Sequence, residues 1–389
     1  MPIRKLLVVD DEIDFGRYVR EVAESQGFEV LLTDNPMEFS ALYSDNLDVV
    51  VLDLFMPGAD GIELLRFLAD NNSQASVVFM SGKDNSVLYT AKELATEQGI
   101  SVLGTLQKPF RARELEVILN KYVKSSLKAT ADNDLVSLDD LAQAIEDKVF
   151  FLVYQPQVSI NDRELIGVEA LVRWKHPVKG MIPPNYFIPM AEENDMISAI
   201  TSFTTKAAIR QQGIWKSQGK NLRVSVNMSP KIFDDLDLPK KIEACASNLG
   251  ADISKLMIEV TETALTTNLA RYMDVLSRLR MKGFGLSIDD FGTGYSSLQQ
   301  LIRVPFSELK IDQAFIRKLT TDKECYTISK ISIMLAHELG MSVVAEGIES
   351  EKEWSILKKL GCDQGQGYWI GRPMAPEGLG LWIKNWSAG

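Results

Sequence analysis

Polar side chains follow several short apolar runs in the first 122 residues. The relevant runs are Lys5–Val9, Val49–Leu52, Val77–Met80 and Val102–Leu106. Their β-branched character is typical of strands that are buried on both faces. The polar residues that follow them are Asp10, Asp11, Asp53, Ser81 and Lys108. Ligands bind beyond the carboxyl ends of strands in an open parallel sheet, so we expect these five side chains to converge.

Three carboxylates in one place repel one another unless a cation compensates their charge. A hard divalent ion such as Mg²⁺, held by carboxylates and waters, fits Asp10, Asp11 and Asp53. Ser81 and Lys108 beside them would bind the oxygens of a phosphoryl group on Asp53. An acidic pair or a Lys-Pro dipeptide alone is usually just a loop or a turn. All five features, in order and each at a strand end, favour a site that accepts a phosphoryl group.

A second series of acids, amides and one lysine lies at strand ends between residues 149 and 389. Its members are Glu169, Asn227, Glu259, Asp289, Asp290, Lys310, Glu346 and Gln366. In a barrel, the carboxyl ends of the strands form the face where active sites are found. The oxygen donors match what Mg²⁺ or Mn²⁺ prefers. Lys310 would hold or polarise an attacking water, and Glu346 would take its proton.

Asp289 and Asp290 are neighbours, and neighbours on a continuing strand point to opposite faces. Both can face one site only where the strand gives way to a loop, and we expect the glycines that follow, Gly292 and Gly294, to supply that break. A bridging carboxylate with another beside it suits two metals roughly 3.5–4 Å apart. Such a pair would activate water and stabilise the entering and leaving oxygens of a phosphoryl transfer.

The simpler alternative is that buried barrel acids satisfy one another through salt bridges with Arg173 and Lys310. For any single acid this alternative is the better interpretation. Polar residues at so many successive strand ends favour a functional site instead.

The elements that must position these residues form two α/β units joined by a linker. Strand–helix alternation over residues 1–122 predicts a doubly wound, flavodoxin-like parallel sheet with helices on both faces. Residues 123–137 are polar and predict a linker with a helical start. Residues 138–389 hold seven or eight strand–helix units, which is the size of a TIM barrel. The strands expected there are Val168–Trp174, Arg223–Asn227, Met257–Val260, Gly285–Asp289, Glu308–Ile311, Ser342–Ala345 and a short piece near Gly367.

Composition excludes several classes of function. The 389 residues are 46% hydrophobic and carry a formal net charge of −11, so no long-range attraction to DNA or anionic lipid is expected. Three dispersed cysteines form no disulfide framework or zinc site, and two histidines make a histidine-rich metal site impossible. The chain has no long apolar segment and no signal-peptide pattern, which predicts a cytoplasmic protein without membrane contact.

Residues 3–122 resemble the receiver domain of two-component response regulators, with the segment from Asp53 to Gly61 similar to that family's phosphorylation loop. The resemblance implies that a sensor histidine kinase phosphorylates Asp53. Asp10, Asp11 and Asp53 would hold Mg²⁺, and Ser81 and Lys108 would contact the phosphoryl group. The sequence departs from the family's pattern in two places: Thr105 stands where the family has an aromatic switch residue, and the segment from Ser81 to Lys108 is several residues longer than usual.

Residues 138–380 resemble the EAL domain of cyclic di-GMP phosphodiesterases. The resemblance rests on Glu169-Ala170-Leu171, Tyr154-Gln155-Pro156, Val226-Asn227, Glu259–Glu262, Asp289–Leu298, Lys310-Ile311-Asp312, Ala345–Glu349 and Gln366-Gly367-Tyr368. It implies that Glu169, Asn227, Glu259 and Asp289 hold one metal and that Asp289 with Asp290 holds the second. The order of the two domains is similar to that of RocR-type regulators.

The resemblance implies further roles. Lys310 and Glu346 would activate the water, with Gln366 supporting it. Arg173, Gln155 and Leu171 would contact the substrate, and Glu262 would anchor the loop after Asp290. A homodimer or higher assembly is implied as well.

The implied reaction opens one phosphodiester of cyclic di-GMP to give linear pGpG, using two Mg²⁺ or Mn²⁺ ions. Two alternatives remain open. One is a non-catalytic sensor of cyclic di-GMP, and the other is a scaffold that binds a kinase through the receiver domain. The sequence gives neither the sign of phosphorylation control nor the identity of the kinase.

Overall fold

The computed structural model describes residues 4–58, 60–82, 85–132, 136–262, 269–293 and 298–386. The chain divides into two compact units, Met1–Asp134 and Leu135–Gly389. Within the described ranges, no helix is both long enough and apolar enough to cross a membrane.

The first unit is a five-stranded parallel sheet in the order β2-β1-β3-β4-β5, which is the flavodoxin-like order of a doubly wound fold. Its strands are β1 (Arg4–Val9), β2 (Phe28–Thr33), β3 (Val49–Asp53), β4 (Ser76–Ser81) and β5 (Val102–Gln107). Its helices are α1 (Ile13–Ser25), α2 (Phe39–Leu42), α3 (Gly61–Asp70), α4 (Asn85–Glu97) and α5 (Ala112–Asp132). The predicted fold class of this unit is confirmed.

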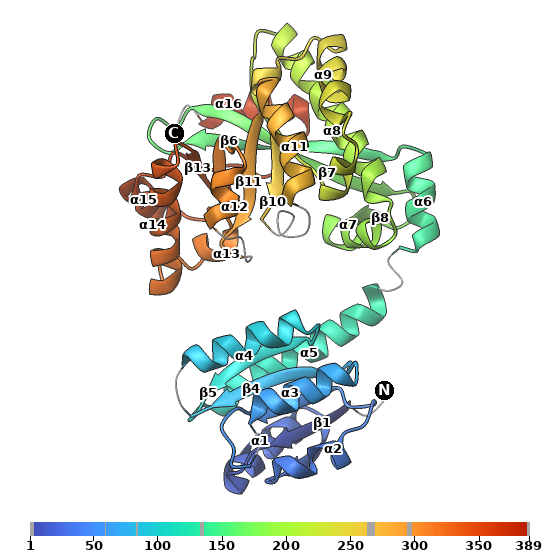
Figure 1. Ribbon diagram of the computed structural model, residues 1–389, viewed down its shortest axis with the longest axis vertical. Helices are drawn as coiled ribbons and strands as arrows, with labels where there is room; N and C mark the ends of the chain where they lie inside the picture. Colours follow the sequence, from blue (N-terminus) through green and yellow to red (C-terminus); the bar gives the residue numbers. More distant parts are fainter. Residues whose placement is uncertain are drawn as a thin grey trace. The chain divides into compact units, whose positions relative to one another are not determined.

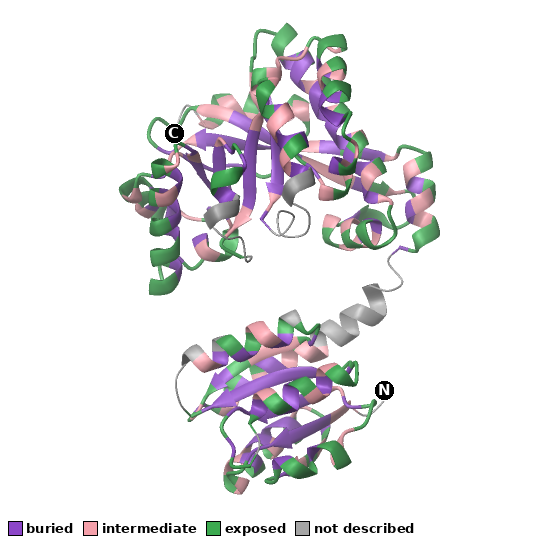
Figure 2. Ribbon diagram, viewed as in Figure 1, coloured by how far each residue is buried: buried purple, intermediate pink, exposed green. Residues whose placement is uncertain are grey.

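Alternate residues of the three central strands, β1, β3 and β4, enter two different cores. On β1, Leu6 and Val8 pack with α1 and α5, whereas Leu7 and Val9 pack with α2, α3 and α4. Figure 2 shows these central strands as mostly buried, whereas β2 and β5 are partly exposed. Burial on both faces explains why the sequence shows continuous apolar runs here instead of a period of two. Helix α5 continues through residues for which a linker with a helical start was predicted.

The second unit is a closed eight-stranded barrel. Its sheet runs β6-β14-β13-β12-β11-β10-β9-β7, and β6 pairs with β7 to close the circle, while β8 extends β7 outward. The strands are β6 (Phe150–Ser159), β7 (Leu165–His176), β8 (Gly180–Ile182), β9 (Arg223–Asn227), β10 (Leu256–Thr261), β11 (Gly285–Phe291), β12 (Glu308–Ile311), β13 (Ser342–Ala345) and β14 (Gln364–Gly365). The TIM-barrel-like fold predicted from the sequence is confirmed.

Helices surround this barrel, as Figure 1 shows. The described ones are α6 (Leu138–Glu146), α7 (Pro184–Glu193), α8 (Ile197–Ser217), α9 (Leu238–Asn248), α11 (Leu269–Met281), α12 (Leu298–Arg303), α13 (Gln313–Ile316), α14 (Lys323–Glu338), α15 (Glu351–Leu360) and α16 (Leu379–Trp386). Ser137 and Asp140 form a capping box at the start of α6. The large core of the unit lies between the barrel and these helices.

Strand β6 departs from the regular alternation of strands and helices. It runs antiparallel to both of its neighbours, β7 and β14, and it was not among the strands predicted from the sequence. Its inward side chains include Gln155 and Gln157, which are polar but buried inside the barrel. Pro156 interrupts this run, and a proline within a run argues against a strand in the sequence.

Candidate active site

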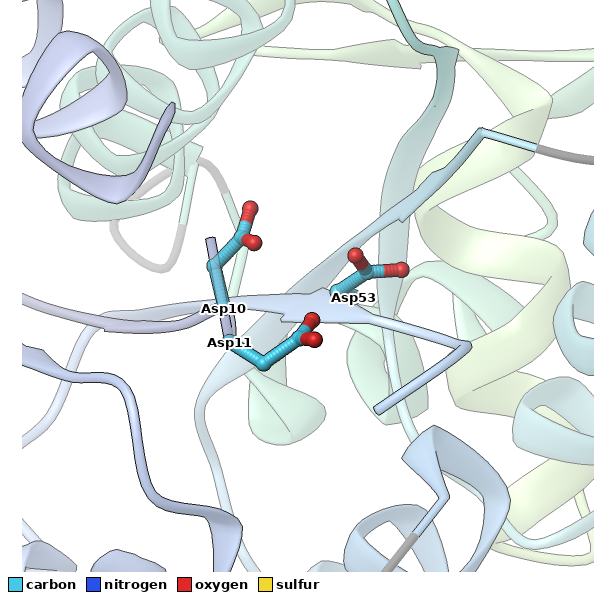
Figure 3. A group of neighbouring side chains, drawn as sticks. All are labelled: Asp10, Asp11 and Asp53. Carbon is cyan, nitrogen blue, oxygen red and sulfur yellow. The ribbon is translucent and has the colours of Figure 1, made fainter. Parts of the chain in front are cut away.

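The receiver-like unit gathers four of its predicted site residues at the carboxyl ends of β1, β3 and β5. Asp10, Asp11 and Asp53 each place a carboxylate oxygen within 4.8 Å of the others, and Figure 3 shows the three side chains together. Lys108 Nζ lies 2.8 Å from an Asp10 oxygen and 2.6 Å from Asp53 Oδ2. Ser81 is buried at the end of β4, and its carbonyl accepts a hydrogen bond from the Lys108 amide.

Burial dominates the electrostatics of this cluster. It raises the pKa of Asp10, although the bond to Lys108 works against the rise. Burial alone would lower the pKa of Lys108, but its bonds to Asp10 and Asp53 outweigh that effect and raise it. The lysine therefore stays charged, and its single charge faces three carboxylates. An oxygen-only donor set with excess negative charge fits a hard divalent cation.

In the barrel, four acids from four different strands surround one lysine. Lys310 Nζ lies 2.6 Å from Glu346 Oε1, 3.0 Å from Glu259 Oε2, 3.1 Å from Asp289 Oδ1 and 3.9 Å from Glu169 Oε2. Both Lys310 and Glu259 are almost completely buried. The convergence expected from strand-end positions is therefore present in the structure.

Asp290 joins this group because the backbone of β11 changes direction at that residue. Its φ is 56°, and the register between β11 and β12 shifts between Ile288 and Phe291. Asp289, Asp290 and Glu346 consequently bring carboxylate oxygens within 4.8 Å of one another. The break thus begins at Asp290 itself, two residues before the first of the glycines that the sequence suggested. Of those glycines, Gly292 has a φ of 96°, and Gly294 lies outside the described residues.

Mutual repulsion and burial perturb the carboxyl groups of this site. Burial, followed by repulsion from Asp289 and Asp312, raises the pKa of Asp290 to about 6. Burial also raises the pKa values of Glu259 and Glu346 well above their usual range, although Lys310 opposes both shifts. Such clustered shifts are typical of functional sites, where the surrounding protein does not fully compensate the charge.

Amide side chains hold Glu169 from the opposite side. Asn227 Nδ2 donates to Glu169 Oε1 at 2.6 Å, and Gln366 Nε2 donates to Glu169 Oε2 at 2.5 Å. Gln366 Nε2 also donates to Gln155 Oε1 at 3.1 Å. Gln155 in turn donates to the Gly371 carbonyl at 3.0 Å. The carboxylate of Glu169 is therefore fixed in orientation.

Two adjoining cavities open onto these residues. One, of about 250 Å³, is lined by Glu169, Asp289 and Glu346 among others, and the second, of about 270 Å³, lies next to it. Both cavities are lined by Leu171, Arg173 and Asn227. The residues predicted to contact a substrate therefore lie beside those predicted to hold metals. Sequence reasoning missed Gln313 and Arg317, which also line the first cavity and belong to no motif. Tyr368 lines it too, and the sequence had indicated it only as part of the Gln366-Gly367-Tyr368 motif.

Glu262 has a different position from the other acids. It is buried, and its Oε2 accepts a hydrogen bond from the Gly292 amide at 2.8 Å. Its own amide donates to the Asp289 carbonyl at 2.9 Å. These bonds tie the end of β10 to the segment that follows Asp290. Residues 294–297 of that segment lie outside the described residues.

The barrel residues fit divalent cations by their chemistry. Lys310 brings one positive charge to Glu169, Glu259, Asp289, Asp290 and Glu346. Glu259 Oε1 is buried and makes no hydrogen bond with the described residues. Every other donor is a carboxylate or amide oxygen, which Mg²⁺ and Mn²⁺ accept. Lys310 does not fill the site, because the cavity lined by Asp289 and Glu346 remains beside it.

Comparison with known proteins agrees with this division of the chain. The model of the EAL domain matches residues 138–373, and that of the response regulator receiver domain matches residues 6–120. The cyclic di-GMP phosphodiesterase RocR of Pseudomonas aeruginosa is 33% identical over 85% of this chain and 85% of its own length.

Two further matches concern the barrel alone. The bifunctional diguanylate cyclase/cyclic di-GMP phosphodiesterase MucR of Pseudomonas aeruginosa is 39% identical, over 66% of this chain but only 38% of its own length. A solved structure described as the PaMucR phosphodiesterase in complex with c-di-GMP is 40% identical, with a TM-score of 0.60. It covers 62% of this chain and 98% of that chain.

Proposed function

This chain belongs to the EAL-domain family and carries a response regulator receiver domain, and on that premise we propose that it is a phosphorylation-controlled cyclic di-GMP phosphodiesterase. Its barrel would hydrolyse cyclic di-GMP to linear pGpG with two divalent cations. One observation carries the proposal: five carboxylates and Lys310 meet beside a cavity that Arg173 also lines.

Each residue of the site has a part in this proposal. Glu169, Asn227, Glu259 and Asp289 would hold one cation, and Asp289 with Asp290 would hold the other. Bound cations of this kind lower the pKa of water and neutralise charge that develops on a phosphate ester. Without such charge compensation, the acidic cavity would repel the phosphates of the substrate.

The other polar groups would bind the substrate and move the proton. Arg173 would attract a phosphate by its charge, and Leu171 and Gln155 would contact the rest of the ligand. Lys310 Nζ, 2.6 Å from Glu346 Oε1, keeps that carboxylate turned toward the cavity, where it would accept a proton from the attacking water. Gln366 would orient the same water through its amide.

The receiver unit would control the barrel through phosphorylation of Asp53 by a sensor histidine kinase. Asp10, Asp11 and Asp53 would hold Mg²⁺, with Ser81 and Lys108 contacting the phosphoryl oxygens. Thr105 lies exposed on β5, so an aromatic side chain does not transmit the signal from that position. Exposed apolar side chains on α14, such as Ile331 and Met334, support the homo-oligomer that we also propose.

The decisive experiment incubates the full chain with cyclic di-GMP and Mg²⁺ or Mn²⁺ and follows the products by chromatography. Formation of pGpG, lost in Glu169→Ala and retained in the exposed control Glu338→Gln, is the expected result. Cyclic di-GMP that is bound but not cleaved would instead support a sensor. The Asp53→Asn variant, assayed with and without a small phosphodonor, tests whether the receiver unit changes the rate.

A further inference from the structure

A second layer of polar side chains lies inside the barrel, one level deeper than the catalytic groups. On β14, Gln364 precedes Gln366 by two residues, and on β12, Glu308 precedes Lys310 by two. Residues two apart on a strand share a face, so the deeper pair points into the same interior. Glu308, Gln364 and Gln157 are buried there. TIM-barrel interiors are usually filled by branched apolar residues, so this polar layer needs an explanation.

Arg223, at the start of β9, organises the deeper layer. Its Nη1 lies 2.6 Å from Glu308 Oε2, and its Nη2 donates to Gln157 Oε1 at 2.9 Å and to Gln364 Oε1 at 2.7 Å. Gly167 makes room for it on the neighbouring strand, because a Cβ there would lie 2.8 Å from the Cβ of Arg223. The guanidinium is thus held in one place by three partners.

The donors and acceptors of this network run in one direction toward the catalytic layer. A guanidinium can only donate, so Gln157 must turn its oxygen to Arg223 and its Nε2 away from it. Gln157 Nε2 then donates to Gln366 Oε1 at 2.9 Å. Because the Oε1 of Gln366 accepts from Gln157, its Nε2 faces Glu169 and donates to Oε2 at 2.5 Å. The carboxylate of Glu169 can only accept, so every hydrogen bond from Arg223 to Glu169 joins a donor to an acceptor.

We propose that Arg223 is a positioning residue that acts through Gln157 to fix the amide of Gln366, and so the carboxylate of Glu169, for binding a divalent cation. The inference rests on the proposed function only in assigning Glu169 to a metal. It adds residues that touch neither the substrate nor the metal. Groups that orient metal-binding side chains typically change metal affinity or activity by about 10–100-fold when they are replaced.

The Gln157→Glu variant reverses the direction of the network at nearly constant shape. The introduced carboxylate would still accept from Arg223, but its second oxygen can only accept from Gln366. Gln366 would have to turn its Nε2 toward that carboxylate and present its oxygen to Glu169, where two acceptors repel. The Gln157→Met variant merely releases Gln366, which keeps its preference for donating to Glu169.

Mn²⁺ binding to the full chain, measured by electron paramagnetic resonance, tests the proposal. All variants carry Asp11→Asn, which removes the receiver site. We expect Gln157→Glu to weaken Mn²⁺ binding by about 10–100-fold and Gln157→Met to weaken it by about three- to tenfold, because Gln366 is then released but not reversed. Charge alone predicts the opposite sign, since an added carboxylate attracts cations. Equal affinities of the two variants, or tighter binding by Gln157→Glu, overturn the proposal.

If circular dichroism shows that Gln157→Glu does not fold, a second variant still tests the proposal. Arg223→Lys keeps a positive charge beside Glu308 but lacks the second nitrogen that reaches Gln157. Its Mn²⁺ affinity should fall at least about threefold, and wild-type affinity in the folded variant overturns the proposal. Failure of the proposed function looks different, because then the unmodified barrel neither binds Mn²⁺ nor forms pGpG.

Discussion

Glu308 and Lys310 lie two residues apart on β12, and both side chains are completely buried inside the barrel. Glu308 pairs with Arg223 in the deeper layer, at 2.6 Å, while Lys310 pairs with Glu346 in the catalytic layer, at 2.6 Å. One short strand therefore supplies a carboxylate to the deeper layer, where it balances the charge of Arg223, and an ammonium group to the catalytic layer, where it faces an excess of carboxylates. Replacing Glu308 would leave the buried guanidinium of Arg223 without its carboxylate, whereas replacing Lys310 would leave buried carboxylates without their cation.

Lys310→Met should destabilise the metal-free barrel by about 3–5 kcal/mol, because it leaves buried carboxylates without their cation. Mg²⁺ should restore more stability to this variant than to the wild type, since the metal supplies the missing charge. Denaturant unfolding of the barrel transition, with and without Mg²⁺, measures both effects. The control is Lys330→Met, which removes an exposed lysine from α14. A metal-free Lys310→Met variant as stable as the control would contradict the prediction.

Asp290→Asn should change the pH dependence of stability. The pKa of Asp290 is raised to about 6 from 3.8, so the folded state holds this proton more tightly than the unfolded state does. Its contribution to stability is then present below about pH 4 and is lost as pH rises through 6. The melting temperature of the metal-free Asp290→Asn variant should therefore equal that of the wild type near pH 4 and exceed it at pH 7. Asparagine also tolerates the φ of 56° at this position.

Calorimetry of both proteins at several pH values makes the measurement. Asp45→Asn, at an exposed position of the other unit, is the control for nonspecific charge effects. With saturating Mg²⁺ at pH 7, the wild type should have the higher melting temperature, because the metal binds the ionised carboxylate of Asp290. A melting difference that does not change between pH 4 and pH 7 would refute the prediction.

Glu262→Leu should weaken divalent binding in the barrel, whereas Glu262→Gln should have a much smaller effect. The buried Glu262 carboxylate accepts from the Gly292 amide at 2.8 Å and so holds the backbone beside Asp290. Glutamine keeps an acceptor oxygen, and leucine does not. We expect the Mg²⁺ concentration for half-maximal hydrolysis to rise at least about tenfold in Glu262→Leu. Equal behaviour of the two variants would mean that the bond to Gly292 is not what matters.

Much of this architecture follows from the sequence, because buried parallel strands carry a strong local signal. The runs ending at Asp10, Asp53 and Ser81 form β1, β3 and β4 within a residue or two of their predicted bounds. The acids at barrel strand ends converge because parallel strands end at the same edge. In both cases, short-range pattern and topology suffice to bring distant residues together.

Other features of the site have no local signal. Arg223 and Glu308 are 85 residues apart, and nothing in either segment indicates that they form a buried pair. Strand β6 contains Pro156, a local signal against a strand that the pairing with β7 overrides. The turn of Asp290 into the left-handed region depends on neighbours that only the fold supplies. Such features arise from tertiary contacts, which hydrophobic periodicity does not record.

Lys108→Met should strengthen Mg²⁺ binding by the receiver unit. In the metal-free protein, the Lys108 ammonium lies 2.8 Å from an Asp10 oxygen and 2.6 Å from Asp53, so it competes with any cation for these carboxylates. Unit charges about 4 Å apart interact by about 4 kcal/mol at an effective dielectric constant of 20. Removing the lysine should therefore raise the Mg²⁺ affinity at least about tenfold.

Isothermal titration calorimetry of the full chain tests this prediction, in a Glu169→Gln background that disables the barrel site. Lys108→Arg is the matched control, because it keeps the positive charge and should bind Mg²⁺ much as the wild type does. The same Lys108→Met variant should accumulate less phosphoryl-Asp53 from a small phosphodonor, since it lacks the lysine that would pair with the phosphoryl oxygens. Unchanged Mg²⁺ affinity in Lys108→Met would show that the lysine and the metal occupy the cluster independently.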